Sequence, residues 1–312
     1  MREVLIKLLI VPAATVLLFF MMFPATSYGA APKIRHSISV YNDNAGENPR
    51  QLKRPGGVGC NDSFFIVADS GNGRLLQYTF RDGNVKTEAE FKLSQLMNPL
   101  KVEINSKGEI YALDGKQRRI VRLSPDGKFM GSIDPKGLPS PVAFVPRSFD
   151  IDMNDNIYVL DIFSSRVLVL NPEGEYQNQI KFPQGYGYFS DISVDFKGDI
   201  LLLDSVQARV LSAKKHAASF SPLTESVRNL REHIRFPVNL TTDERGRIFL
   251  IDRNGGLIIV LGQDGSFLGQ ASSFGMKEGL LNYPSQACIN TEGKVFIADT
   301  HNNRVQIFEL LR

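Results

Sequence analysis

The chain has 312 residues, 43% of them hydrophobic, and a formal net charge of +3. The hydrophobic content is ample for a packed core. The charge is small and scattered, with no arginine-rich tail and no run of basic and aromatic residues, so we expect no nucleic-acid partner.

The N-terminal segment has the layout of a secretory signal peptide. Arg2 and Lys7 precede the uncharged stretch 8–23, and small residues follow at 24–31. This order is typical of a cleaved export signal. An uncleaved anchor is the alternative, but the stretch is interrupted by Pro12 and is shorter than the roughly 20 residues that span a bilayer comfortably. We therefore expect residues 1–30 to be a signal peptide or anchor, and residues 31–312 to lie outside the cytoplasm, periplasmic or secreted.

Beyond this segment one short phrase occurs six times. Its Asp recurs at steps of 45, 47, 43, 48 and 47 residues, and an Arg follows five residues later in every copy except the fifth, which has Leu257. The recurring residues are Asp69, Asp114, Asp161, Asp204, Asp252 and Asp299, with Arg74, Arg119, Arg166, Arg209 and Arg304. Such self-similarity indicates a repeat array in which each unit is one supersecondary element.

Each copy has the pattern of four antiparallel strands. A stretch that usually begins with Pro leads into a polar turn such as 105–108, which has hairpin chemistry. An apolar run such as 157–160 then ends at the Asp, and apolar residues at successive positions predict a strand covered on both faces. A third strand follows the Arg, and a turn such as 126–127 leads to the fourth.

The last copy stops after its third strand, and the alternating segment 34–41 precedes the first copy. We expect this segment to supply the missing strand, which closes the array into a ring and removes its free edge. Four-stranded sheets with both faces covered are satisfied best by radial stacking. The predicted fold class is therefore all-β, a six-bladed β-propeller of four-stranded antiparallel blades closed by an N-terminal strand.

The sixth copy, 293–308, and the turn 69–74 of the first copy resemble the NHL repeat. The resemblance covers the chain after residue 50 and is weakest in the fifth copy, 252–257, which lacks the Arg. Propellers of the NHL type include adaptors, RNA binders and a few enzymes, so the resemblance implies the fold and leaves the activity open.

The repeated Asp and Arg residues are expected to be structural. A residue that recurs in every blade serves the packing and turn geometry that all blades share. A single active site instead needs residues that differ between blades. We expect the Asp side chains to accept hydrogen bonds from turn amides, and the Arg side chains to pair with carboxylates or carbonyls between blades.

Aligned first strands place polar residues at alternate positions, which share one face of a strand. Those expected to ring the central channel are Glu103, Asp150, Asp191, Asn239 and Gln286. Oxygen ligands of this kind suit Ca²⁺, and calcium-dependent lactonase propellers, which this arrangement resembles, line their channel in this way. A polar, water-filled channel without a metal is the other interpretation, and we favour it.

Other catalytic patterns are weak. The four histidines, His36, His216, His233 and His301, do not occupy equivalent positions, so the metal–histidine site of amidating lyases with this fold is not expected. The sequence has no Gly-x-Ser-x-Gly elbow and no glycine-rich phosphate loop. We predict no catalytic residues and no cofactor, with Ca²⁺ as the one candidate ion.

Two segments are candidate contact surfaces on the rim. One is the aromatic cluster near residue 186, and the other is the segment 223–234, whose apolar residues have helical spacing and either cap the blade or dock a partner. The candidate residues are Tyr186, Tyr188, Phe189, Arg228 and Arg231.

The only cysteines, Cys60 and Cys288, fall on first strands of the first and sixth copies, which become neighbours when the ring closes. They form either a disulfide or two separate small buried residues. They differ by one place in their repeats, and we therefore favour the second alternative.

The sequence thus favours an exported, monomeric, non-catalytic propeller that acts as a rigid platform for another exported or cell-envelope protein. It would contact a membrane only through an uncleaved N-terminal segment. The alternative is a metal-dependent hydrolase or lyase, lactonase-like or amidating-lyase-like, that uses the central channel.

Overall fold

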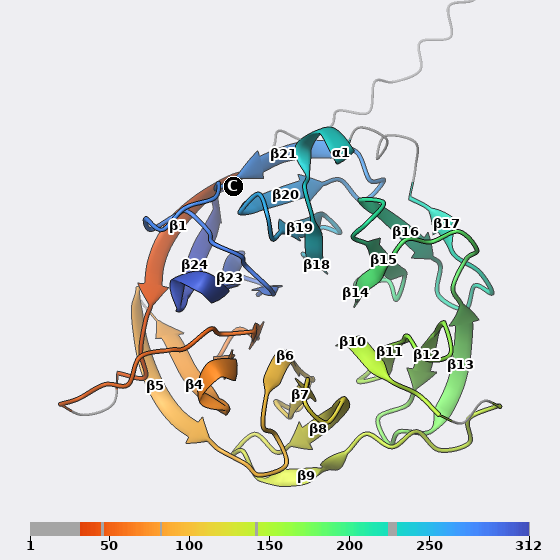
Figure 1. Cartoon of the computed structure of the whole chain (residues 1–312), viewed down its shortest axis with the longest axis horizontal. Helices are drawn as coiled ribbons and strands as arrows, with labels where there is room; N and C mark the ends of the chain where they lie inside the picture. Colours follow the sequence, from red (N-terminus) through yellow and green to blue (C-terminus); the bar gives the residue numbers. More distant parts are fainter. Residues whose placement is uncertain (1–31, 45–46, 82, 141–142, 224–229, 312) are drawn as a thin grey trace, which may run out of the picture.

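The structure is a computed structural model, and it describes residues 32–311 except 45–46, 82, 141–142 and 224–229. The predicted signal peptide lies outside the described residues and stays a prediction. Six four-stranded sheets surround a central axis (Figure 1), which confirms the predicted six-bladed propeller. No helix within the described ranges is long and apolar enough to cross a membrane.

The first three blades contain, from the axis outward, β2 (Gly57–Cys60), β3 (Phe65–Asp69), β4 (Arg74–Arg81) and β5 (Asn84–Phe91); β6 (Pro99–Ile104), β7 (Ile110–Asp114), β8 (Arg119–Leu123) and β9 (Phe129–Ser132); and β10 (Pro146–Ile151), β11 (Ile157–Asp161), β12 (Arg166–Leu170) and β13 (Tyr176–Lys181). Neighbouring strands within each blade are antiparallel, as the repeats predict.

The other three contain β14 (Phe189–Val194), β15 (Ile200–Asp204), β16 (Arg209–Ala213) and β17 (Ser221–Pro222); β18 (Pro237–Thr242), β19 (Ile248–Asp252), β20 (Leu257–Leu261) and β21 (Phe267–Ala271); and β22 (Ala287–Ile289), β23 (Lys294–Asp299), β24 (Arg304–Leu311) and β1 (Lys33–Val40). The short helices are η1 (Ser70–Asn72), α1 (Leu230–His233) and η3 (Thr300–Asn302).

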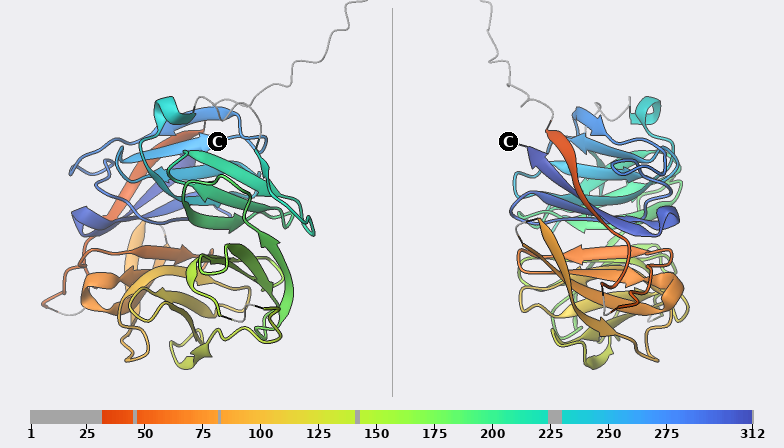
Figure 2. Two further views of the ribbon diagram at one scale, coloured as in Figure 1. Left: turned by 45° about the vertical axis from the view of Figure 1, so that its right-hand side comes forward. Right: turned by 90° about the vertical axis from the view of Figure 1, so that its left-hand side faces the viewer.

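The N-terminal strand closes the ring. β1 pairs antiparallel with β24, from Lys33 opposite Leu311 to Val40 opposite Val305. The right-hand view of Figure 2 shows the two strands side by side, although they come from opposite ends of the chain. The N-terminal strand β1 is therefore the outermost strand of blade six, and it covers the edge that β24 would otherwise expose.

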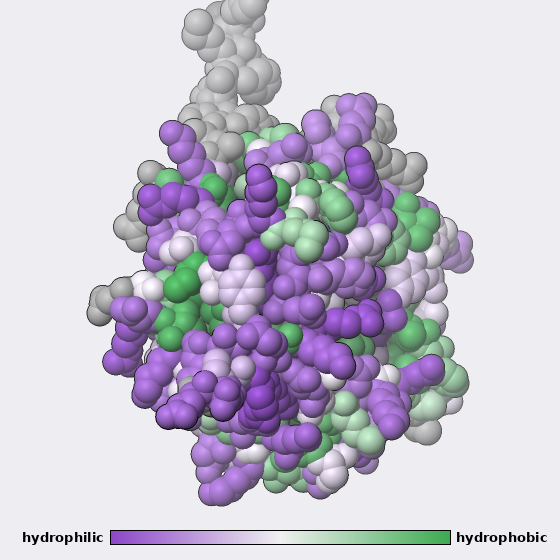
Figure 3. All heavy atoms as spheres, turned by 60° about the vertical axis from the view of Figure 1, so that its left-hand side comes forward, coloured by the Kyte–Doolittle hydropathy of each residue, from purple (hydrophilic) through white to green (hydrophobic). Residues whose placement is uncertain are grey.

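The core lies between blades. Every residue of β7, β11, β15 and β19 is buried, because these strands are covered on both faces by neighbouring blades. Blades one and six meet through Phe65 and Phe296, whose ring centroids are 4.9 Å apart. The side of the molecule seen in Figure 3 is mostly hydrophilic with separate apolar patches.

The repeated Asp side chain of blade six, with its Arg, holds the loop that enters the blade. Asp299 is fully buried and accepts hydrogen bonds from the Asn282 amide at 2.7 Å and from Arg304 Nε at 2.7 Å. Arg304 also donates to the carbonyls of Lys277 and Leu280 at 2.8 and 2.9 Å. The pair therefore fastens the loop that enters blade six to the blade itself.

Blade five lacks the repeated Arg. Leu257 replaces it, and Asp252 instead accepts hydrogen bonds from the amides of Arg235, Phe236 and Asn254. Backbone amides thus supply the donors that the buried carboxylate needs.

In three blades the residue after the repeated Asp joins its blade to the next one. Ser70, Ser205 and Thr300 donate hydroxyl hydrogen bonds to a Pro carbonyl that begins the next blade, and Thr300 reaches the Pro55 carbonyl at 2.8 Å. Gly115, Ile162 and Arg253 stand at this position in the other three blades and have no hydroxyl.

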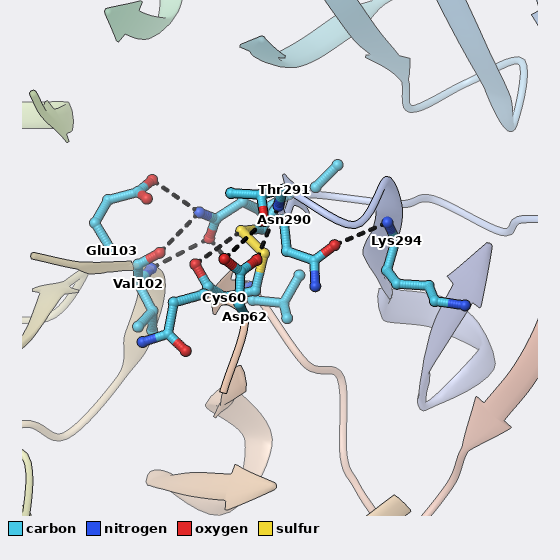
Figure 4. Close-up of a disulfide and its surroundings, with 12 residues drawn as sticks. Cys60, Asp62, Val102, Glu103, Asn290, Thr291 and Lys294 are labelled. Carbon is cyan, nitrogen blue, oxygen red and sulfur yellow. Dashed lines mark hydrogen bonds between the residues drawn. A yellow bond between two sulfur atoms is a disulfide. The ribbon is translucent and has the colours of Figure 1, made fainter. Parts of the chain in front are cut away.

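The expectation of two separate cysteines is wrong. Cys60 and Cys288 form a disulfide, and their Cα atoms are 5.8 Å apart (Figure 4). First strands of neighbouring blades converge at the axis, and this brings the Cα atoms within disulfide range despite the offset of one place. Beside the bridge, Thr291 donates its amide and hydroxyl to Asp62 at 2.9 and 2.7 Å, which joins the same two blades.

Replacing both cysteines, Cys60→Ala with Cys288→Ala, should lower the free energy of unfolding by about 2–5 kcal/mol, because the bridge spans 228 residues and restricts the unfolded chain. Denaturant unfolding under oxidising conditions measures this loss. The variant should be insensitive to reductant, whereas reduction should destabilise the unsubstituted protein. Equal stability of the two proteins would contradict the assignment of the bridge as a ring closure.

Replacing Arg304 with Ala should cost about 3–5 kcal/mol, because it leaves Asp299 buried without its cation. The matched variant is Arg209→Ala, since Arg209 is 31% exposed and lies 3.6 Å from Asp204. It should cost about 1 kcal/mol or less. Equal losses in urea unfolding would show that burial of the pair does not set its contribution.

Candidate functional site

The central channel opens at one face of the ring into a cavity of about 870 Å³. Its wall includes residues of η1 and η3, and these two turns lie on the face nearer the viewer in Figure 1. We call this the mouth face. A second, small cavity of about 30 Å³ lies deeper in the channel and includes Lys101, Glu103 and Asp150 in its wall.

Four of the five candidate channel residues lie on first strands around the axis, and Gln286 immediately precedes the first strand of blade six. Each of the four from blades three to six accepts a backbone amide of the following blade: Asp150 from Val194 at 2.7 Å, Asp191 from Leu240 at 2.9 Å, Asn239 from Ala287 at 2.9 Å, and Gln286 from Val58 at 3.2 Å. The innermost strand of a blade has a free edge, and these side chains satisfy amides along it.

Gln286 also forms hydrogen bonds with blade two, which is not adjacent to blade six. It accepts from the Val102 amide at 3.1 Å and donates to the Val102 carbonyl at 2.9 Å, so it joins blade six to blade two across blade one. Gly57 makes this span feasible, because a Cβ there would lie 2.4 Å from Gln286 Oε1.

A lysine lies among the channel carboxylates. Lys101 Nζ contacts Asp191 Oδ1 at 2.7 Å and Glu103 Oε1 at 3.5 Å, and it donates to Ser148 Oγ at 3.0 Å. Asp191 also accepts hydrogen bonds from Ser148 Oγ and from Asn239 Nδ2, the latter at 2.7 Å. Asp191 is 2% exposed, and both of its oxygens are occupied.

Burial determines the protonation of this cluster. Desolvation raises the pKa of Glu103 well above its ordinary value, and it outweighs the opposing charge of Lys101; Asp150 and Asp191 raise the pKa further. Desolvation also raises the pKa of Asp150. Burial alone would lower the pKa of Lys101, but Asp191, Glu103 and Asp150 raise it instead.

These donors do not fit a calcium site. The Lys101 ammonium occupies the space between carboxylates that a cation would need, and Asp150 is directed to a backbone amide of blade four. Among residues 32–311 with their gaps, no group of three or more His, Cys, Asp or Glu side chains lies close enough to hold a metal. The channel residues therefore join blades, and the sequence did not reveal that Lys101 takes the central position.

The histidines are far from a common site. His36 packs edge-on against Phe308, His233 stacks on Phe267, and His301 stacks on Tyr283 at 4.5 Å between ring centroids. His216 lies in a turn with φ of 66°. Three of the four thus have aromatic packing partners in different places.

The mouth cavity contains three arginines that sequence reasoning missed. Arg54, Arg147 and Arg253 come from blades one, three and five and line the same cavity. Each one breaks the repeat pattern: Arg147, for example, stands where the other blades have Gly, Leu, Ser, Val and Ser. Departure from the repeat was the signal that could have identified them.

Apolar side chains accompany the arginines. Leu100, Val206, Phe236 and Val238 line the cavity. The Arg147 guanidinium lies over the Tyr188 ring, 4.8 Å from its centroid, in a cation–π contact.

The predicted rim surface is only partly formed. Tyr186 is 38% exposed and Tyr188 lines the cavity, but Phe189 is 2% exposed and packs between blades, so its assignment to a contact surface is wrong. Phe189 begins β14, and its ring stacks under Tyr186.

The predicted helix at 223–234 is described only in part. Arg228 and the side chain of Arg231 lie outside the described residues. Leu230 and Ile234 are buried in the cluster between blades four and five, and Leu223 packs against it, so the described part caps its own propeller.

Comparisons with known proteins agree with this fold. The NHL repeat family matches residues 281–308. NHL repeat-containing protein 3 of Homo sapiens is 32% identical over 76 residues, which cover 23% of this chain and 22% of that protein. This chain carries an NHL repeat. The same protein of Mus musculus is 30% identical over 76 residues, again 22% of its length, so the match to both relatives spans about a fifth of each.

Solved structures similar to this propeller include enzymes. A streptogramin B lyase has a TM-score of 0.60 and 14% identity, covering 90% of this chain and 98% of that one. A gluconolactonase from Xanthomonas campestris has a TM-score of 0.63 and 12% identity, covering 90% and 95%. At these identities the likeness concerns the six-bladed fold alone.

Glu103→Gln should change the pH dependence of stability. The raised pKa means that folded Glu103 keeps a proton that the unfolded chain releases above about pH 4.5, so wild-type stability falls as pH rises from there towards the raised pKa. The variant cannot ionise and lacks this fall. Its free energy of unfolding should therefore gain on the wild type by up to about 1.4 kcal/mol per pH unit in that window.

Denaturant unfolding at a series of pH values between about 4 and 8 measures this difference, across the window in which the carboxyl titrates. Glu292→Gln, which removes an exposed carboxylate from a turn, is the control and should give a constant difference. Parallel curves for Glu103→Gln and wild type would contradict the raised pKa.

Proposed function

We propose that this NHL-repeat propeller is an exported, non-catalytic platform that binds another exported or cell-envelope protein at its mouth face. The contrast between channel and mouth carries the proposal. The channel carboxylates are bound by Lys101 and by amides of neighbouring blades, whereas the arginines at the mouth have no carboxylate partner among the described residues.

The loops and strand ends around the mouth expose apolar side chains. Val206 is 62% exposed, Phe163 63%, Ile162 43% and Leu100 40%. Arginine together with aromatic and aliphatic residues is typical of the surfaces that proteins use to bind one another. The blades hold these loops rigidly, because their ends are fixed by the repeated Asp side chains.

The alternative function is a metal-dependent hydrolase or lyase that uses the channel. Its support is the likeness in fold to a lyase and a gluconolactonase. The position of Lys101 among the carboxylates argues against it, because an ammonium and a divalent cation would compete for the same oxygens.

Photo-crosslinking in the organism that makes this protein tests the platform. With p-benzoylphenylalanine in place of Val206 on the mouth face, we expect an adduct with one discrete protein in the extracytoplasmic fraction. The matched position is Met153, which is 77% exposed in a turn at the opposite end of β11 and should give no such adduct.

Absence of an adduct from Val206, or equal adducts from both positions, would contradict a partner-binding mouth face. About one tightly held Ca²⁺ or Zn²⁺ per chain, measured by elemental analysis after dialysis of untagged protein, would instead support the channel enzyme.

A further inference from the structure

The partner's contribution to this interface can be specified by its chemistry. Resting on the proposed function, we infer that the mouth cavity takes an acidic segment of the partner protein, whose carboxylates contact Arg54, Arg147 and Arg253 and whose apolar side chains enter the cavity between them.

The charges of the three arginines are not balanced by ion pairs within the described part of the protein. In the described part of the chain, none of their guanidinium groups forms an ion pair or donates a hydrogen bond. By contrast, the repeat arginine Arg304 contacts a carboxylate and two carbonyls. The mouth arginines are therefore available to external carboxylates, which the planar guanidinium binds with two parallel hydrogen bonds.

The floor of the cavity does not neutralise them. Among the described residues of the cavity wall, Asp191 is the only one with a carboxylate, and its oxygens are already bound by Lys101, Ser148 and Asn239. The cavity therefore has an excess of positive charge, which attracts an acidic partner and disfavours a basic one.

The charges of these arginines affect the pKa of groups at the same mouth. Partial burial lowers the pKa of Arg147 and the charge of Arg253 lowers it further, whereas the charge of Asp191 raises it. Burial, followed by Arg54 and Arg253, lowers the pKa of His301 at the same mouth. Bound carboxylates would relieve this repulsion between like charges.

The rest of the wall requires apolar groups next to the carboxylates. Leu100, Val206, Phe236 and Val238 line the cavity between the arginines. Tyr188 lines the cavity and lies beneath the Arg147 guanidinium. Tyrosine and arginine are the residues on which binding energy concentrates in protein interfaces.

A protein segment fits this site better than a small organic acid. All three arginines are exposed to solvent, and a single ion pair with an exposed arginine contributes little to affinity. Beyond the cavity wall, Ile162 and Phe163 extend the exposed apolar surface over the blade-three turn. A segment that presents several carboxylates and covers these side chains as well adds contributions that a small acid lacks.

The direct test uses a fluorescein-labelled decapeptide that alternates Glu with Phe or Leu, and a twin with Gln in place of every Glu. We expect fluorescence anisotropy with the full-length protein to show at least about tenfold tighter binding of the acidic peptide, with affinity falling as salt rises.

Variants locate the binding. Arg147→Glu with Arg253→Glu should weaken the acidic peptide by about tenfold or more. The matched control is Lys107→Glu with Arg245→Glu, which makes the same change in charge at exposed turns on the opposite face and should bind as wild type does. Circular dichroism and thermal unfolding establish that both variants are folded.

Equal binding of the two peptides, or equal effects of the two double variants, would overturn the inference. Complete displacement of the peptide by an equal concentration of 4-phenylbutyrate would also overturn it and assign the cavity to small organic acids.

Failure of the inference can be separated from failure of the platform. If the Val206 adduct persists in the Arg147→Glu, Arg253→Glu background, the platform stands and the acidic segment is wrong. If wild type gives no adduct while the acidic peptide binds as expected, the platform proposal fails and the peptide specificity of the cavity stands.

Discussion

Closure of the ring is the constraint on which the other features of this protein depend. Each blade buries both faces against its neighbours, so the first and sixth blades are fully covered only when they meet. The Cys60–Cys288 disulfide near the axis and the contact of Thr291 with Asp62 in the turns join these two blades. The pairing of β1 with β24 completes blade six at its outer edge.

Closure also determines what the channel residues do. At the axis, first strands present an unpaired edge, and Asp150, Asp191, Asn239 and Gln286 each accept an amide from the next blade. Lys101 then compensates carboxylates that are too buried to remain unpaired. The polar side chains of the channel thus mainly hold neighbouring blades together, although enzymes share the six-bladed fold.

The arginines proposed for recognition have side chains that, in the described part of the chain, form no hydrogen bond from one blade to another. In blade five, Arg253 occupies a position where three other blades place a hydroxyl that joins them to the next blade. Its guanidinium lines the mouth together with Arg54 and Arg147. Departure from the repeat at single positions therefore gives a symmetric scaffold one distinctive face, and this face carries the proposed function.

The sequence by itself determined the blade count, the strand order and the closing strand, because these follow from local patterns that recur at a fixed period. It also identified side chains that face the channel, because alternation along a strand is local. Only the tertiary structure decided that Cys60 reaches Cys288, that Lys101 lies among the carboxylates, that Phe189 is buried, and that three arginines from alternate blades share one cavity. These depend on how strands about 45 residues or more apart converge at the axis, and no local pattern contains that distance.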